Sequence, residues 1–141
     1  MEKETLKNIF DFLEKNDNKN KPFKWKLLNN VPLTEDELTI KGNLDLDDSE
    51  IKTLPEDLQV NGFLSLAESD IESLPEGLSI GRSLNLSYCK EITSLPKGLE
   101  VGWNLNIRGT KLQKYTDDEL REMIKPGFLK GEIYRGWIKK H

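Results

Sequence analysis

The sequence contains few of the residues that carry catalysis or covalent cross-linking. Among its 141 residues there is one cysteine, Cys89, and one histidine, His141. A single cysteine cannot form an intramolecular disulfide, and a histidine at the end of the sequence is poorly placed for a Ser-His or Cys-His dyad. We therefore expect no catalytic residue, no enzyme activity, no metal and no cofactor, and we interpret Cys89 as structural.

Long apolar segments are missing as well. Residues 1–7 lack the apolar stretch of a signal peptide, and no run approaches the length of a membrane-spanning helix. The net charge of −4 with 33% charged residues describes a mildly acidic surface, which argues against nucleic acid as the main partner. We expect a cytoplasmic protein that does not contact membranes.

What the sequence does contain is a fourfold repeat between Leu38 and Leu112. Its apolar residues recur every 20 residues, and the third copy has one residue more. The copies align on pairs of alternating apolar residues, which are Leu44 and Leu46, Leu64 and Leu66, Leu84 and Leu86, and Leu105 and Ile107. A fixed period this short is typical of a solenoid, in which the units stack side by side.

Within each copy, the alternation of apolar and polar residues predicts a short strand with one buried face. Successive strands must then be parallel. The first three copies continue with an Ile-x-x-Leu-Pro step, as in Ile51 to Pro55, and the proline suits a return segment outside the strand ladder because it lacks an N–H group. A single coil buries too little apolar surface to offset the entropy of ordering it, so the coils must stack and need covered ends.

The repeat resembles a known family. Leu84-Asn-Leu86-x-x-Cys89 followed by Ile92-x-x-Leu95-Pro96 is similar to the leucine-rich repeat, L-x-L-x-x-N-x-L-x-x-L-P, in its short bacterial form. The resemblance covers about 75 of 141 residues, and the family's asparagine is replaced here by Ser49, Ser69, Cys89 and Thr110. It implies a protein-recognition scaffold, and similar Leu-Pro-x-Gly-Leu arrays occur in bacterial and bacteriophage proteins.

Helices are expected on both sides of the repeats. Over residues 3–16 the apolar residues Leu6, Ile9, Phe10 and Leu13 share one helical face. We interpret this helix as a lid over the first coil, with a partner-binding or membrane-surface helix as the alternative. The capping box Thr116-Asp-Asp-Glu119 predicts a second helix over residues 116–125 that closes the far end.

The remaining flanking segments are less regular. Phe23, Trp25, Leu27 and Leu28 suggest an extended segment, and Thr34 to Glu37 either open a helical turn or form the outer loop of an incomplete coil. After the second helix, Phe128, Leu129, Ile133, Tyr134, Trp137 and Ile138 show no clean periodicity. We interpret them as cap packing, with a docking or mobile tail as the alternative.

The sequence thus predicts an α/β fold, a leucine-rich-repeat-like parallel β solenoid of four coils of about 20 residues with helical caps at both ends. We expect an N-terminal helical cap and connection at residues 1–37, the repeat solenoid at 38–115, and a C-terminal helical cap and tail at 116–141.

The third coil is the irregular one, and we expect the partner to bind there. Its extra residue places Tyr88, Lys90 and Glu91 on a turn that bulges, and insertions in repeat arrays often fall on the binding face. Arg108 follows in the next coil and Phe63 precedes by one, on what we take as the neutral and basic half of the strand face. The alternative is that the extra residue relieves a packing conflict and Tyr88 lies flat on the array.

The function expected from these features is non-enzymatic protein binding. A narrower hypothesis, from the resemblance to phage-borne arrays, is an inhibitor of a host defence protein such as a CRISPR nuclease. One alternative is a structural or self-assembling module, because acids prevail over residues 35–50 and bases over 125–141, which would allow head-to-tail contacts. Another is a small-ligand or signal-nucleotide binder, which would need a basic concavity. Homo-oligomerisation and the identity of the partner are left open.

Overall fold

The computed structural model describes residues 22–136. The chain divides into two compact units, residues 1–33 and 34–141. In the first unit, the described residues form one short helix, α2 (Phe23–Leu28). The extended segment expected there is therefore wrong: Phe23, Trp25 and Leu27 imitate a period of two, but leucine and lysine favour a helix. The helix expected over residues 3–16 lies outside the described residues.

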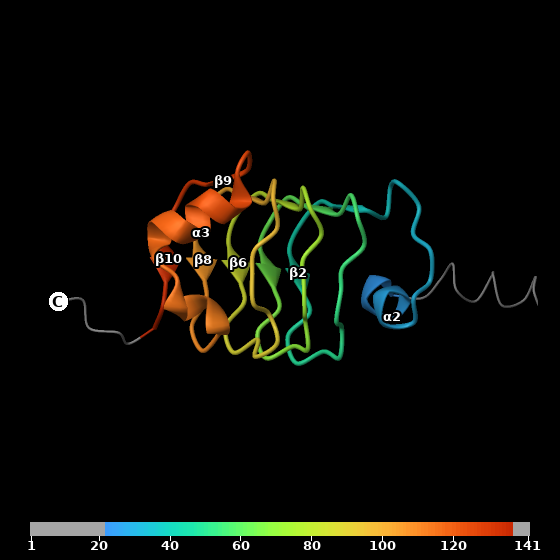
Figure 1. The fold of residues 1–141 in the computed structure, drawn as a ribbon. Coiled ribbons are helices and arrows are strands. Elements are labelled where there is room, and N and C mark those ends of the chain that lie inside the picture. The colour runs from blue at the N-terminus through green and yellow to red at the C-terminus, as the bar shows by residue number, and fades with distance from the viewer. Residues whose placement is uncertain (1–21, 137–141) are drawn as a thin grey trace, which may run out of the picture. The chain divides into compact units, whose positions relative to one another are not determined.

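In the second unit, two parallel sheets run along an array of coils (Figure 1). Sheet A consists of β1 (Thr39–Ile40), β3 (Gln59–Val60), β5 (Ser79–Ile80), β7 (Glu100–Val101) and β9 (Phe128–Leu129). Sheet B consists of β2 (Leu44–Asp45), β4 (Leu64–Ser65), β6 (Leu84–Asn85), β8 (Leu105–Asn106) and β10 (Ile133–Tyr134). Neighbouring strands pair at the expected register, as Leu44 with Leu64 and Leu64 with Leu84. The parallel β solenoid is confirmed.

The core lies inside the coils and consists of stacked aliphatic side chains. The inward residues that follow the strands of sheet B have no exposed surface; they are Leu46, Leu66, Leu86 and Ile107. The leucines of the Leu-Pro steps are buried as well, at 6–7% exposure; they are Leu54, Leu74 and Leu95. Each side chain therefore packs against its equivalents in the coils above and below, and the hydrophobic burial that no single coil could provide is shared along the array.

A second buried column consists of small side chains at the equivalent position of the first four coils; they are Ser49, Ser69, Cys89 and Thr110. Cys89 is fully buried there, its thiol donates to the carbonyl oxygen of Leu66 at 2.8 Å, and the Oγ atom of Ser69 lies 3.7 Å from its sulfur. Burial raises the pKa of the Cys89 thiol, and hydrogen bonds from Ser69 lower it in part. A buried thiol with a raised pKa is a poor nucleophile, which fits the structural interpretation of this residue.

The coils approach one another closely at the corner that joins sheet A to sheet B. One of the two residues at this corner is a glycine in every coil; these are Gly42, Gly62, Gly81, Gly102 and Gly131. A Cβ atom on Gly81 would lie 2.2 Å from the carbonyl oxygen of Asn61, and one on Gly102 would lie 2.1 Å from that of Gly81. Carbon and oxygen do not approach so closely, so the backbone of one coil can lie on the next only where the side chain is missing.

The chain continues as a solenoid beyond the fourth repeat. The sequence predicts cap packing or a tail for the segment from Phe128 to Ile138. Trp137 and Ile138 lie outside the described residues, and the described part of the segment forms β9 and β10, which pair in parallel with β7 and β8. Their offset from the preceding strands is 28 residues, because a 3₁₀ helix, η1 (Lys111–Lys114), and α3 (Asp117–Ile124) lie in the connection. The helix and its Thr116–Glu119 capping box are confirmed. The number of four coils is not, since each sheet has a fifth strand.

The residues that precede the first strand form a turn. Thr34 and Glu37 exchange the hydrogen bonds of a capping box, each at 3.2 Å, but no helix follows them.

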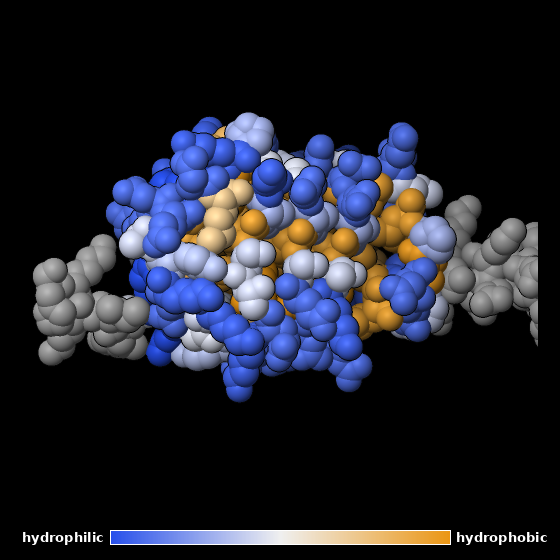
Figure 2. Space-filling model, viewed as in Figure 1, coloured by the Kyte–Doolittle hydropathy of each residue, from blue (hydrophilic) through white to orange (hydrophobic). Residues whose placement is uncertain are grey.

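The surface of the array is predominantly polar. In the view of Figure 2, hydrophilic side chains cover most of the face shown, and apolar atoms appear in a band between them. None of the helices within residues 22–136 has the length and apolar character needed to cross a membrane.

Candidate functional site

A tight turn follows each inward residue of sheet B, and its third residue has a positive φ angle. The residues at this position are Asp48 (φ 56°), Glu68 (58°), Tyr88 (59°) and Gly109 (72°). The turn is closed by a backbone hydrogen bond, as from Cys89 to Leu86 at 3.1 Å. Turns of this kind favour glycine or asparagine at that position. Glutamate and tyrosine there are unusual, at a cost of roughly 1–2 kcal/mol each.

Stacking of the coils holds these two residues in their strained conformation. The backbone N–H of Glu68 donates to the carbonyl oxygen of Ser87 at 2.9 Å, and that of Tyr88 donates to Arg108 at 2.7 Å. Both bonds continue the ladder of sheet B beyond the last strand residue. The array therefore imposes the conformation, and the two side chains are directed outward. Strain that the surrounding structure maintains in this way is concentrated at functional sites in proteins.

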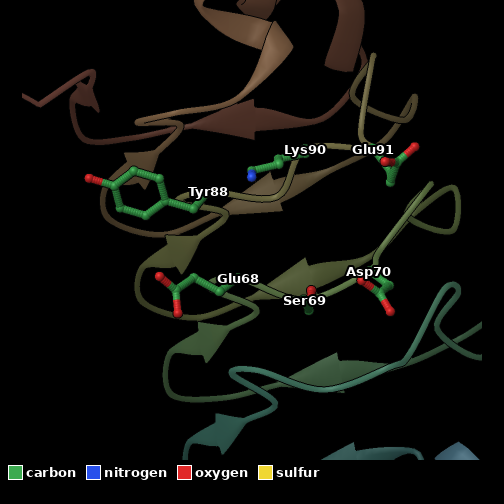
Figure 3. Close-up of a pocket in the computed structure, with 6 residues that line it drawn as sticks. All are labelled: Glu68, Ser69, Asp70, Tyr88, Lys90 and Glu91. Atoms are coloured by element: carbon green, nitrogen blue, oxygen red, sulfur yellow. The ribbon is translucent and has the colours of Figure 1, made fainter.

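Glu68 and Tyr88 line the same hollow, of about 380 Å³. Figure 3 shows its six residues on two neighbouring coils: Glu68, Ser69 and Asp70 on one, and Tyr88, Lys90 and Glu91 on the next. The extra residue of the third coil lies at the bend of Lys90 and Glu91, both of which are exposed. The irregular coil, the strained turn residues and the hollow therefore coincide, and we call this region the Tyr88 hollow.

The ring of Tyr88 lies against the next coil. A Cβ atom on Gly109 would be 2.5 Å from its Cδ1 atom, so the absence of a side chain at Gly109 makes room for the ring. The guanidinium carbon of Arg108 lies 5.4 Å from the ring centroid, which is a cation–π distance. Tyr88 as a whole residue nevertheless remains 39% exposed. Tyr88 and Arg108 are thus neighbours, and the ring lies against the array at Gly109, as the alternative for Tyr88 supposed.

The Tyr88 hollow is acidic. Its lining carries three carboxylates, of Glu68, Asp70 and Glu91, against one ammonium group, of Lys90. Hydrogen bonding with Asp48 and repulsion from it raise the pKa of the Glu68 carboxyl, and Lys90 opposes this shift. The prediction that Tyr88 lies in neutral and basic surroundings is therefore wrong. The coil that contributes Glu68 also contributes Asp70, and both acids lie at the edge where Tyr88 is found. Such a lining favours a cationic group of a ligand.

Phe63 does not belong to this group. It lines a second hollow of about 270 Å³, together with Leu64, Ser65, Arg82, Ser83, Asn85 and Trp103. We call this region the Trp103 hollow. The five residues expected to bind a partner are thus divided: Tyr88, Lys90 and Glu91 line one hollow with Arg108 beside it, and Phe63 lies in the other. The sequence analysis missed Glu68 and Asp70 in the first hollow, and Arg82 and Trp103 in the second.

Within residues 22–136, no group of three or more histidine, cysteine, aspartate or glutamate side chains is arranged to hold a metal ion. Comparison of the chain with protein-family models gives no match. Comparisons with curated proteins and with solved structures give no match either. The resemblance to leucine-rich repeats therefore stays a prediction from the sequence, and the residues of the two hollows carry the argument about function.

Proposed function

We propose that the chain is a non-enzymatic protein-binding module and that the Tyr88 hollow is part of its binding surface. The observation that carries this proposal is that two residues in strained backbone conformations, Glu68 and Tyr88, line one open hollow beside the irregular bend at Lys90 and Glu91. Glycine at either position would remove the strain, as at Gly109 in the next coil. Side chains retained at such a cost are expected to have a role outside the fold.

The chemistry of the hollow fits a cationic side chain of a partner protein. Three carboxylates line it, and the partly exposed Tyr88 provides a large contact area at a low entropy cost. Arg108, held over that ring, is of the residue type most often found with tyrosine at the centre of interfaces. A partner lysine or arginine that enters the hollow would meet carboxylates on both of the coils that line it.

The proposal is tested by capture of partners from cells that contain this protein, followed by affinity measurement. The double variant Tyr88→Ala/Arg108→Ala is expected to weaken the principal interaction by about 2 kcal/mol or more. A matched control exists on sheet A, where Lys130 lies 5.2 Å from the ring of Phe128, which is 40% exposed. Phe128→Ala/Lys130→Ala removes a similar aromatic–cation pair, and the affinity should be unchanged.

Two results would count against the proposal. One is unaltered affinity of a folded Tyr88→Ala/Arg108→Ala variant for the captured partner. The other is equal loss of affinity in the sheet A control, which would indicate a general effect of surface truncation. The narrower hypothesis, an inhibitor of a host defence protein such as a CRISPR nuclease, makes a further demand. The captured partner must then be such a protein, and the purified chain must reduce its cleavage of DNA.

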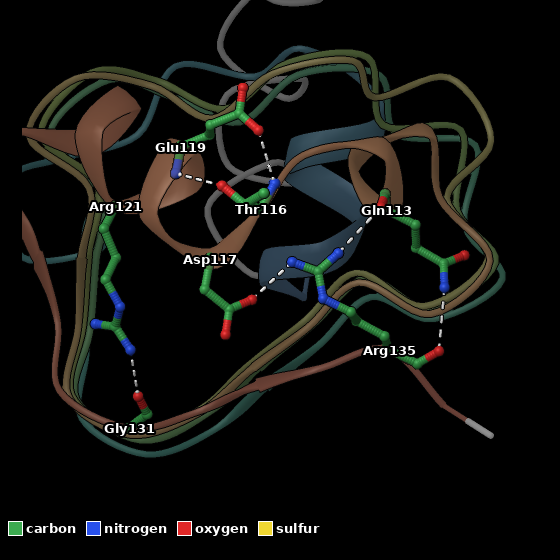
Figure 4. Close-up of polar contacts among 7 residues, drawn as sticks. All are labelled: Gln113, Thr116, Asp117, Glu119, Arg121, Gly131 and Arg135. Carbon is green, nitrogen blue, oxygen red and sulfur yellow. Dashed lines mark hydrogen bonds and ion pairs between the residues drawn. The ribbon is translucent and has the colours of Figure 1, made fainter. Parts of the chain in front are cut away.

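We also propose that α3 and the segment that follows it act as the C-terminal cap of the array. Figure 4 shows Arg135 directed into the outline of the coils. By the register of β8 and β10 it occupies the place of the inward residue Ile107. Its guanidinium donates to the carbonyl oxygen of Gln113 at 3.1 Å and pairs with Asp117 at 2.7 Å. A charged group in the inward column would oppose the stacking of another coil, which is what a cap requires.

The alternatives make different predictions. A self-assembling module would increase in mass with protein concentration, which light scattering after size exclusion measures directly. A binder of signal nucleotides would need a concentration of positive charge. The Tyr88 hollow has three acids and one lysine, and the Trp103 hollow has a single arginine. Neither hollow therefore favours a polyphosphate ligand.

A further inference from the structure

A ladder of polar side chains runs along the corner between the two sheets, and Phe63 interrupts it. At this corner, a side-chain oxygen in one coil accepts a hydrogen bond from the backbone N–H of the next coil. The bonds run from Phe63 to Asn43 (2.9 Å), from Asn104 to Ser83 (3.4 Å) and from Glu132 to Asn104 (2.9 Å). Phe63 occupies the equivalent place in the second coil but has no acceptor to offer to Ser83. The chain gives up one bond of the ladder there and exposes 39% of an aromatic residue.

The neighbouring corner position departs from the repeat as well. In the first two coils the glycine is the second corner residue, after Lys41 and Asn61. In the third and fourth coils it moves to the first place, and the second place carries a large side chain instead; these pairs are Gly81-Arg82 and Gly102-Trp103. In each coil that lies on a preceding one, one corner position must be glycine because the two coils approach so closely. The shift by one residue keeps that requirement and allows Arg82 and Trp103 to be presented on the outside.

These three departures come together in the Trp103 hollow. Phe63, Arg82 and Trp103 come from three successive coils, and all line it. Trp103 is 58% exposed, the most among the large apolar side chains exposed in the described residues. At these positions the chain departs from its own repeat pattern, and the departures do not stabilise the fold. Departures of that kind are expected at functional positions. Exposed aromatic residues that gather at one place mark interaction sites.

The charge of the hollow specifies its ligand further. The guanidinium carbon of Arg82 lies 5.7 Å from the centroid of the Trp103 ring. Within residues 22–136, no ion pair or side-chain hydrogen bond joins Arg82 to another residue, and the other residues of the lining are uncharged. A guanidinium group next to aromatic rings has a planar array of donors that matches a carboxylate. The apolar rings beside it match an aromatic or large aliphatic side chain.

We infer that the Trp103 hollow docks a segment of a partner protein that carries an aromatic or large aliphatic residue directly next to an acidic one. The apolar side chain packs against Phe63 and Trp103, and the carboxylate pairs with Arg82. This inference rests on the proposed function, because it takes the array to be a protein-binding surface. It adds a second contact point whose charge preference is opposite to that of the acidic Tyr88 hollow.

The test uses the full chain, labelled with ¹⁵N, and defined peptides. The probes are three tetrapeptides with blocked ends: Gly-Phe-Asp-Gly, Gly-Phe-Asn-Gly and Gly-Ala-Asp-Gly. The indole N–H signal of Trp103, assigned with the variant Trp103→Phe, reports on the hollow. We expect saturable shifts at millimolar Gly-Phe-Asp-Gly and about tenfold weaker binding of each of the other two peptides, a factor that corresponds to one lost contact.

Two variants separate the contribution of Arg82 from that of any surface cation. Arg82→Gln should remove the preference for aspartate over asparagine while leaving the weak binding of the phenylalanine peptides. Lys130→Gln, which removes the cation beside Phe128 on sheet A, should leave the preference unchanged. Equal binding of all three peptides, or a preference that survives Arg82→Gln, would overturn the inference.

Other outcomes identify a different occupant. A peptide that binds at a single contact site is expected to have a dissociation constant on the order of a millimolar. The absence of any shift of the Trp103 signal at about 5 mM peptide would therefore overturn the inference. If the signal instead moves with protein concentration alone, the occupant is a second copy of this chain. Peptide binding at Trp103 combined with unchanged partner affinity of Tyr88→Ala/Arg108→Ala would retain this hollow and refute the Tyr88 hollow. Absence of peptide binding at Trp103, combined with weakened partner affinity of Tyr88→Ala/Arg108→Ala, would retain the Tyr88 hollow and refute the Trp103 hollow.

Discussion

The close approach of the coils at their corner gives the sharpest test of the fold. Gly102 and Gly42 are both corner glycines, but their surroundings differ. A Cβ atom on Gly102 would lie 2.1 Å from the carbonyl oxygen of Gly81 and 2.8 Å from its carbonyl carbon, whereas one on Gly42 would have no heavy atom within 4 Å. The substitutions Gly102→Ala and Gly42→Ala therefore add the same methyl group to a stacked coil and to open space.

The cost of Gly102→Ala follows from the movement it requires. Relief of the contact displaces the backbone by about 1 Å, which is an overpacking change that costs about 1–3 kcal/mol. The same displacement stretches two bonds of the ladder, from Gly102 to Ile80 (2.9 Å) and from Trp103 to Arg82 (3.1 Å). At about 1 kcal/mol for each bond, the total loss is about 3–5 kcal/mol. Gly42→Ala should change the free energy of unfolding by less than about 1 kcal/mol, with a stabilising sign.

The measurement is urea unfolding followed by circular dichroism, with the midpoint compared at a common m value. Thermal unfolding gives a second reading, and Gly102→Ala should lower the melting temperature by about 12 °C or more for a unit of this size. The reasoning is refuted if Gly102→Ala stays within about 1 kcal/mol of the parent protein. It is also refuted if Gly42→Ala is destabilised as strongly, since that would mean that both corners are equally crowded.

Further predictions concern the core, the buried thiol and the strained turn. Leu66→Asp should unfold the protein, because a carboxylate in the fully buried column costs several kcal/mol; an unchanged melting temperature would contradict the register. Cys89→Ser should fold normally, and Cys89 in the native protein should react with iodoacetamide far more slowly than in urea, because burial raises its pKa; equal rates would contradict this. Glu68→Gly should stabilise the protein by about 1 kcal/mol, measured by urea unfolding, by removal of backbone strain. The Glu68 carboxyl has a higher pKa in the folded protein than its ordinary value of 4.5, so its protonation stabilises the fold. This contribution to stability is complete below pH 4.5 and is lost as the pH rises through the pKa of the folded state. Asp48→Asn should lower the pKa of Glu68 in an NMR titration and reduce this pH-dependent loss of stability.

Much of the solenoid could be predicted from the sequence because its period is nearly constant. A repeat of 20 residues fixes which leucines stack, and the strand pairs follow that register. The last strands were missed because α3 increases the offset to 28 residues. In addition, Gly127 and Arg135 stand where Leu99 and Ile107 would predict apolar residues, so the last coil does not read as a repeat. The last coil therefore owes its strands to pairing with the preceding coil and not to a pattern of apolar residues in its own sequence.

The site was predictable only in part. The extra residue of the third coil identified Tyr88, Lys90 and Glu91, because an insertion is visible in an alignment of repeats. Glu68 was missed because no sequence pattern shows that the turn demands a positive φ when its occupant is not glycine. The shift of glycine that precedes Trp103 is visible in the sequence. It acquires meaning only when stacking shows that one corner position has no room for a side chain.

If the Trp103 hollow is a docking site, it places a limit on how the length of the array can change in evolution. Repeat proteins change in length when whole units are duplicated or lost. Phe63, Arg82 and Trp103 each come from a different coil, so a unit inserted among them would separate them by a further 4.8 Å or so, the spacing of paired strands. A unit added before Leu38 would leave their spacing unchanged. The number of leading repeats can therefore vary without affecting such a docking site, whereas a unit gained or lost between Leu58 and Gly109 would separate the residues that form it.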